Sequence, residues 1–132
     1  MRREVYEMVI TNNPLLRDAK GVEFVEGGFR DVLVRARDLT YLGHELITHP
    51  LFASLGMMFS PFRSIVVSDR PEGFSPEQAQ LAEDSIASYD LATEGRRRIE
   101  RNDADYARMD LELLQAALEE CGEAGGRVGL CA

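Results

Sequence analysis

A predicted β-strand meets a predicted helix in the stretch Val5-Tyr6-Glu7-Met8-Val9-Ile10-Thr11-Asn12-Asn13-Pro14. Its first six residues include β-branched and aromatic side chains, which favour a strand. Asn13 is expected to cap a short helix, because its side chain can accept a hydrogen bond from a backbone amide that the first turn leaves free. Pro14 suits the first helical position, where no amide donor is needed. The stretch therefore predicts the strand–helix alternation of an α/β protein.

The same alternation continues through the first half of the chain. Three further strands are predicted, at residues 22–26, 44–48 and 64–68. A longer helix is predicted over residues 29–42, where apolar side chains recur at helical spacing, and Gly43 can end it in a left-handed conformation. Residues 51–63 form a connecting loop. The predicted fold class is α/β, with a small parallel or mixed four-stranded sheet covered by helices in Rossmann-like layering.

The second half of the chain predicts helices alone, over residues 75–94 and 102–121. Ser75 can cap the amide of Gln78 while the Gln78 side chain reaches back to Ser75. Whether residues 95–102 break a helix or only bend it stays open, since their arginines are compatible with helix. We expect a single domain, in which residues 1–70 hold the sheet, residues 71–121 the C-terminal helices and residues 122–132 a flexible tail.

Charge is unevenly distributed along the chain. The 132 residues include 15 basic and 23 acidic side chains, a formal net charge of −8, yet residues 1–70 carry nine of each sign. The whole imbalance therefore lies in the helical half. An acidic chain without a basic stripe is a poor candidate for nucleic-acid binding, which begins with the neutralisation of phosphates. No apolar run approaches the roughly 20 residues of a membrane-spanning helix, so no membrane association is expected either.

Cysteine usage points to a reducing compartment. The two cysteines, Cys121 and Cys131, do not form a disulfide framework and are not spaced as metal ligands. No apolar signal-peptide core follows Met1, so we expect a cytoplasmic protein. The two histidines do not make a metal site with any acidic spacing in the chain, and neither a dinucleotide-binding nor a Walker pattern is present. No metal and no cofactor are therefore expected.

Polar, turn-forming residues follow the predicted strands, and ligands of α/β sheets bind beyond the carboxyl ends of the strands. Gly27 and Gly28 precede a helix whose free amides attract anions, although they can equally form a simple turn. Arg63 can hold a carboxylate in a bidentate fork, or pair with an acid at the surface. Asn12 is the better ligand candidate, because Asn13 is occupied in capping. The predicted ligand-binding residues are Thr11, Asn12, Asn13, Gly27, Gly28, Thr48, His49, Arg63 and Ser64.

His49 is the single candidate for a catalytic residue. It follows a predicted strand and precedes a proline, where an imidazole can act as an acid, a base or a donor to an anion. The alternative is that its ring fixes the local turn. The other histidine, His44, follows a helix end, and its ring is expected to meet the last helical carbonyls.

The loop over residues 51–59 is unusually apolar, with two phenylalanines and two methionines. Exposed together, such side chains would form a sizeable patch. Either the loop folds over the end of the sheet as a lid, or it packs on a partner or on a second copy. The last helix also has a broad apolar face, so a homodimer is plausible.

Four blocks of the sequence resemble the GrdX family. They are Ile10-Thr11-Asn12-Asn13-Pro14-Leu15, Val22-Glu23-Phe24-Val25-Glu26-Gly27, Gly43-His44-Glu45-Leu46-Ile47-Thr48-His49-Pro50-Leu51 and Pro61-Phe62-Arg63-Ser64-Ile65. The blocks come in the family's order and at similar spacing, over roughly residues 5–69. Members of this family are small proteins encoded beside the selenium-dependent glycine, sarcosine and betaine reductases. The resemblance implies this context, and it supplies no reaction.

Three hypotheses about function follow. The first is an accessory protein of the reductase system that binds a small anionic metabolite, or a reductase component, at the strand ends. The second is a small enzyme in which His49 is the acid or base, while Asn12, Thr48 and Arg63 orient a small carboxylate substrate. The third is a dimeric assembly factor for a reductase component. No catalytic set is recognisable, so the first is favoured over an enzyme.

Overall fold

The computed structural model describes residues 7–54, 56–95 and 100–122. Its strands and longer helices are β1 (Glu7–Thr11), β2 (Val22–Phe24), α1 (Phe29–Tyr41), β3 (Ser64–Ser68), α2 (Pro76–Thr93) and α3 (Asp103–Gly122). Short 3-10 helices lie at Pro14–Leu16, Gly56–Phe59 and Glu100–Asn102. The strand order is β2-β1-β3, with β2 parallel and β3 antiparallel to β1. The α/β class is confirmed, and the described residues form a mixed sheet of three strands rather than four.

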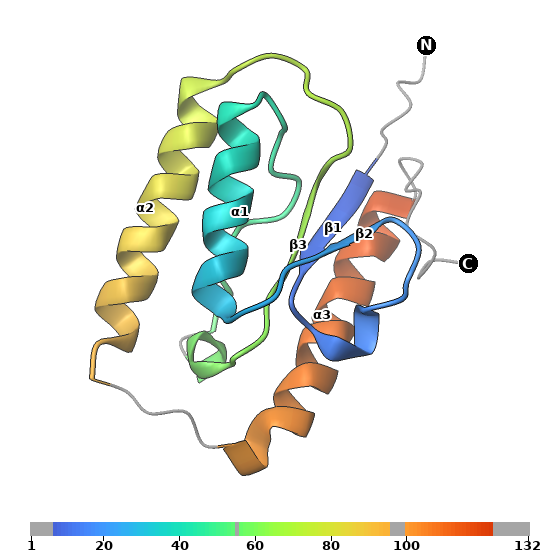
Figure 1. Cartoon of the computed structure of the whole chain (residues 1–132), viewed down its shortest axis with the longest axis vertical. Coiled ribbons are helices and arrows are strands. Elements are labelled where there is room, and N and C mark those ends of the chain that lie inside the picture. The colour runs from blue at the N-terminus through green and yellow to red at the C-terminus, as the bar shows by residue number, and fades with distance from the viewer. Residues whose placement is uncertain (1–6, 55, 96–99, 123–132) are drawn as a thin grey trace.

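Helices cover both faces of this sheet (Figure 1). Successive side chains of a strand point to opposite faces. Ile10 of β1 and Ile65 of β3 therefore pack on the side of α1 and α2, which lie next to each other. Val9 and Val66 point to the other face and pack against Leu114 of α3. Because α2 and α3 lie on opposite sides of the sheet, they are two helices and not one bent helix.

The third of the four predicted strands, residues 44–48, makes only an isolated bridge to β3. Side chains occupy one amide of the segment that faces away from β3 and one β3 amide that a continuous ladder would use. The amide of Leu46 donates to Gln78 Oε1 at 2.7 Å, and the amide of Val66 donates to Thr48 Oγ1 at 3.0 Å. The Val66 carbonyl also accepts from the successive amides of Ile47 and Thr48. In a regular antiparallel ladder it would accept from one of them, so the ladder does not continue. The prediction of a strand is therefore wrong.

Two predicted helix caps are present. Asn13 Oδ1 accepts from the amide of Leu15 at 3.0 Å, and Ser75 Oγ accepts from the amide of Gln78 at 3.3 Å. The reverse half of the second cap is wrong, because the Gln78 side chain accepts from Leu46 instead of reaching back. The start of α2 is thereby fastened to the segment that follows α1.

Gly43 ends α1 as predicted, with φ at 102°. Its amide donates to the Thr40 carbonyl at 3.1 Å, and the amide of His44 donates to the Leu39 carbonyl at 2.9 Å. This is a Schellman ending, which requires a left-handed residue at this position. The His44 ring does not meet the helix carbonyls, because its Nδ1 lies 2.7 Å from the carbonyl of Ser68 at the end of β3.

Gly43→Ala is expected to lower the free energy of unfolding by about 1–2 kcal/mol, because alanine is strained at a positive φ. Its Cβ would also lie 3.2 Å from the backbone nitrogen of Gly73. Gly28→Ala is the matched control, since Gly28 has φ at −100° and its Cβ would come no nearer than 3.9 Å to Asp31. Urea denaturation of both variants checks this, and equal losses would contradict the strain at Gly43.

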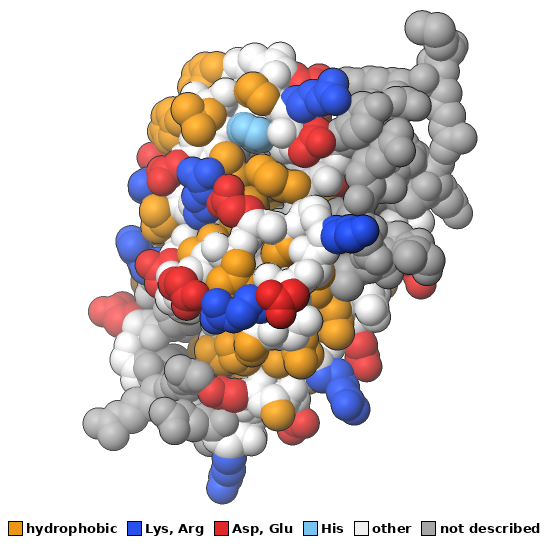
Figure 2. Space-filling view, turned by 45° about the vertical axis from the view of Figure 1, so that its right-hand side comes forward, with side chains coloured by type: hydrophobic (Ala, Val, Ile, Leu, Met, Phe, Trp, Pro, Cys, Tyr) orange, Lys and Arg blue, Asp and Glu red, His pale blue; other side chains and the backbone are white. Residues whose placement is uncertain are grey.

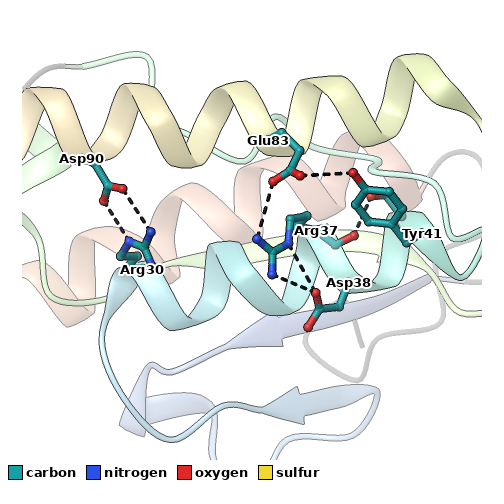
Figure 3. Close-up of polar contacts among 7 residues, drawn as sticks. Arg30, Arg37, Asp38, Tyr41, Glu83 and Asp90 are labelled. Carbon is teal, nitrogen blue, oxygen red and sulfur yellow. Dashed lines mark hydrogen bonds and ion pairs between the residues drawn. The ribbon is translucent and has the colours of Figure 1, made fainter.

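Ion pairs join the outer faces of α1 and α2, as Figure 3 shows. Arg30 binds both carboxylate oxygens of Asp90, at 2.9 and 3.1 Å. About two turns further along α1, Arg37 lies 3.5 Å from Glu83. Glu83 also accepts a hydrogen bond from Tyr41 at 3.1 Å. Both arginines and both acids are seven residues apart, so the pairing fits antiparallel helices in one register. Exposed pairs of this kind each contribute only about 0.2–1 kcal/mol.

Basic and acidic side chains are interspersed over the face shown in Figure 2. Among the described residues, no helix is long and apolar enough to cross a membrane. The predicted tail covers residues 122–132, but Gly122 is the last residue of α3. The rest of it, including Cys131, lies outside the described residues, as does the side chain of Cys121.

Candidate functional site

Asn12, just after β1, ties three separate segments together. Its Nδ2 donates to the carbonyls of Gly27 at 2.9 Å and Pro61 at 2.8 Å, and its Oδ1 accepts from the amide of Arg63 at 2.9 Å. The residue is 5% exposed. Both amide protons are used within the protein, so the expectation of a freer side chain than that of Asn13 is wrong. Asn12 instead fixes the backbone on which Arg63 stands.

Arg63 is a buried cation held by carbonyl groups. Its Nε donates to the Pro50 carbonyl at 2.7 Å and its Nη2 to the His49 carbonyl at 2.6 Å. The guanidinium lies over the Phe52 ring, 4.1 Å from the centroid. Burial lowers the pKa of Arg63 to about 10, against the opposing effect of the Asp110 charge. Arg63 therefore stays positively charged at neutral pH, and it is not the surface arginine that the alternative interpretation expected.

One nitrogen of this guanidinium, Nη1, has no partner among the described residues. Within the part of the chain that the structure describes, Arg63 Nη1 makes no hydrogen bond, and no carboxylate lies within ion-pair distance of the side chain. Although Nη1 has no partner among these residues, it is not completely shielded from solvent. The residue as a whole is 7% exposed. A buried charge normally has an opposite charge or a full set of hydrogen bonds, whereas Arg63 has a donor nitrogen that no described residue uses.

Arg63 lines a cavity of about 330 Å³ between the loop after residue 47, the start of β3 and α3. Thr48 and His49 line the same cavity. His49 Nδ1 accepts from the amide of Leu51 at 3.0 Å, so the neutral ring carries its proton on Nε2. Thr48 Oγ1 accepts from the amide of Val66, and its hydroxyl proton has no acceptor among the described residues. Thr48, His49 and Arg63, each with a donor that no described residue uses, therefore line one cavity, an arrangement suited to an anion.

A buried polar network lies behind this cavity and joins β1, β3 and α3. Asp110 of α3 is fully buried. Its Oδ1 accepts from the amide of Ser64 at 3.0 Å, and its Oδ2 accepts from Ser64 Oγ at 2.6 Å and from Asn13 Nδ2 at 2.9 Å. Thr11 Oγ1 lies 2.7 Å from Ser64 Oγ and accepts from the amide of Asn13. These groups saturate one another and hold the wall of the cavity.

The glycine pair before α1 is not an open anion site. Asp31 Oδ2 accepts from the amide of Gly28 at 2.7 Å, so a carboxylate of the protein itself occupies the helix start. Gly27 has φ at 128°, and a Cβ there would collide with the Asp31 side chain. The pair makes the tight turn that was the alternative interpretation.

The apolar loop folds over the end of the sheet. Met58 is buried in the core with Ile65, and Phe52 meets the Phe29 ring edge-on at a centroid distance of 5.7 Å. Leu51 also packs against this core. Among the described residues of the loop, the large apolar side chains therefore pack inward. They do not form an exposed patch for a partner or a second copy of the chain, which was the alternative to a lid.

The predicted site residues divide into three groups. Those that line the cavity are Thr48, His49, Arg63 and Ser64. Thr11, Asn12 and Asn13 support it from behind, and Gly27 and Gly28 form a turn that Asn12 fastens. The carboxyl-end rule failed for β3, whose antiparallel course places its first residue, Ser64, beside Thr11 and its last residue at the opposite edge.

Sequence reasoning missed the contribution of α3. Leu113, Leu114 and Ala117 form one wall of the cavity, and Asp110 anchors its floor. The signal for Asp110 was present, because a charged residue stands within the apolar stripe of the last helix. Among the described residues, no three His, Cys, Asp or Glu side chains are grouped as metal ligands.

Comparison with known proteins gives one match. The family model described as GrdX-like protein matches residues 8–119. No curated protein and no solved structure matches the chain. The matched span begins in β1 and extends through most of α3, so it includes every element that borders the cavity.

Proposed function

The chain belongs to the GrdX-like protein family, and from this we propose that it is an accessory protein of the glycine, sarcosine and betaine reductase system that binds a small anionic metabolite at Arg63. The observation that carries the anion site is the unused Nη1 donor of a guanidinium that is otherwise buried and held by carbonyl groups. The reductase context rests on the family resemblance. It predicts that the gene lies beside genes for a reductase.

A carboxylate or phosphate would supply the acceptor that Arg63 lacks. In a poorly hydrated pocket a charge-assisted hydrogen bond is stronger than at the surface. His49 and Thr48 line the same cavity and carry two further donors, the Nε2 proton and the hydroxyl. The Asp110 carboxylate does not compete for this role, because it accepts three hydrogen bonds from Ser64 and Asn13.

We favour binding over catalysis. An enzyme using His49 as acid or base requires Asn12 in the same cavity, and Asn12 turns its amide to the carbonyls of Gly27 and Pro61. His49 is exposed and its Nδ1 is occupied by the Leu51 amide, which leaves one ring nitrogen as a donor. The assembly-factor hypothesis loses the exposed loop on which it relied, since Met58 and Phe52 pack inward.

Titration with sodium acetate and sodium phosphate tests this proposal, with sodium chloride at equal ionic strength as the reference. We expect saturable binding of acetate or phosphate, measured by NMR chemical shifts of backbone amides around Thr48 and His49. His49→Ala is expected to weaken binding roughly tenfold, because it removes one donor to a charged acceptor while keeping the carbonyl that holds Arg63.

His44→Ala is the matched control, because His44 bonds to Ser68 at the opposite end of β3. It should leave the affinity unchanged. Equal effects of acetate, phosphate and chloride, or equal affinities of the two histidine variants, would contradict an anion site at Arg63.

A further inference from the structure

A second cavity, of about 310 Å³, adjoins the one that contains Arg63. Ser54 and Met57 line both cavities. The second is bordered on its other side by α3, through Tyr106 and Met109. The two hollows therefore share a wall and lie along one helix.

The α3 side chains that border these cavities lie on one face of the helix. Tyr106, Met109, Leu113 and Ala117 are spaced by three or four residues, which places them in one row. Met109 is 45% exposed and Leu113 47% exposed. Large apolar side chains left half in solvent beside a pocket are typical of a ligand groove. We define these four residues, with Met57, as the α3 groove.

The two ends of the α3 groove carry opposite charges. The Arg63 guanidinium lies at one end, in the cavity of Thr48 and His49. The carboxylate of Asp105 lines the cavity at the other end. An anionic head group is therefore attracted to the Arg63 end and repelled from the far end, while the apolar α3 groove lies between them.

The α3 groove suits a hydrocarbon chain better than a peptide. Where the two cavities meet, the lining residues are Ser54, which has one polar group, and Met57; Asn102 and Asp105 also line the second cavity. The side chains of Met57, Met109 and Leu113 have no N–H or O–H group to recognise the amides and carbonyls of a peptide. An aliphatic chain has no such groups, and it gains from covering Met109 and Leu113.

From these observations we infer that the ligand is a carboxylate with an unbranched aliphatic chain of short to medium length. Its carboxylate binds Arg63 Nη1 and its chain lies in the α3 groove. This inference rests on the proposed function and adds to it the chemical class of the ligand.

Isothermal titration calorimetry with acetate, butanoate, hexanoate and octanoate tests the inference, at octanoate concentrations below micelle formation. We expect the affinity to increase about two- to fourfold for each added methylene, because each is removed from water. Hexan-1-ol, which has the chain and no charge, is expected to bind more weakly than hexanoate. 6-Aminohexanoate should also bind more weakly than hexanoate, since its ammonium would enter an apolar groove.

Met109→Gln is expected to weaken octanoate at least tenfold and to leave acetate unchanged, because Met109 lines the second cavity and not the one that contains Arg63; since Met109 is 45% exposed, the variant should fold. Leu91→Gln is the control, since Leu91 is 76% exposed on α2 and does not line either cavity. Acetate binding without any dependence on chain length would overturn the aliphatic class and leave the anion site in place. Failure of every carboxylate to bind would remove the anion site itself.

Two other outcomes would overturn the inference. If 6-aminohexanoate binds more tightly than hexanoate, the Asp105 end recognises an amine and the chain class is wrong. If sedimentation velocity shows a dimer that Met109→Gln dissociates and Leu91→Gln does not, the α3 groove is an interface between two copies of the chain.

Discussion

Asp110→Ala is expected to lower the free energy of unfolding by about 3–5 kcal/mol, the usual cost of removing one member of a buried charged network. The loss has two sources. The amide and hydroxyl of Ser64 and the Asn13 side chain would lose their acceptor in the core, and the buried Arg63 would lose the nearby negative charge. Thr11 would lose its ordered partner as well, because Ser64 Oγ would be free to rotate.

Glu112→Ala is the matched control for this prediction, since Glu112 lies two positions further along α3 and is exposed. Its loss is expected to stay within about 0.5 kcal/mol. Urea denaturation, monitored by circular dichroism, compares the two variants with the parent chain. A loss for Asp110→Ala that is within about 1 kcal/mol of the control would contradict a network that couples α3 to the sheet.

The penalty of Asp110→Ala is also expected to depend on pH. Burial raises the pKa of Asp110 above the ordinary value of an aspartate, although hydrogen bonds from Ser64 and Asn13 oppose the shift. The folded protein therefore keeps this proton to a higher pH than the unfolded chain does. The contribution of Asp110 to stability is largest below the ordinary pKa of an aspartate and falls as pH rises through the raised pKa. The difference in stability between parent and variant should shrink accordingly over this range.

Asn12→Asp is expected to destabilise the protein more than Asn12→Ala, although aspartate is the closer match in shape. In Asn12→Ala the carbonyls of Gly27 and Pro61 and the amide of Arg63 lose their partners, at a combined cost of about 2–4 kcal/mol. In Asn12→Asp a carboxylate faces those two carbonyls in a nearly closed site, which adds repulsion and desolvation.

Gln80→Ala is the control for these variants, because the Gln80 side chain is an exposed amide that bonds only to Asp84 four residues away. It should cost less than about 0.5 kcal/mol. Urea denaturation at neutral pH measures all three. If Asn12→Asp is as stable as Asn12→Ala, the two amide protons of Asn12 do not hold the segments together.

Local signals in the sequence identified most elements of the fold. The helix starts at Asn13 and Ser75 and the glycine ending at Gly43 depend on neighbours within a few residues, and all three were predictable for that reason. The apolar strands were recognisable too, because their burial shows in composition. The irregular course of residues 44–48 was not, since the Gln78 side chain accepts from the amide of Leu46 and the Thr48 hydroxyl accepts from the amide of Val66, contacts that only the tertiary structure creates.

The candidate site was predictable in its chemistry and not in its construction. Arg63 and His49 were selected because a cation and an imidazole near a strand end suit an anion, and both line the cavity. Periodicity does not show which way β3 runs, and its antiparallel course is what places Ser64 opposite Thr11. Asn12 looked available because its three partners lie 15 to 51 residues away in sequence.

Whether Arg63 receives the anion can be observed directly by NMR of the arginine side chains in the ¹⁵N-labelled protein during titration with sodium acetate. The Arg63 guanidinium signal is expected to shift and to saturate, because Nη1 gains an acceptor. The Arg30 signal is the internal reference, since that guanidinium is already bound to Asp90 through two hydrogen bonds, and it should stay in place. An Arg63 signal that does not move, or that moves no more than that of Arg30 in acetate and in chloride alike, would contradict anion binding at this residue.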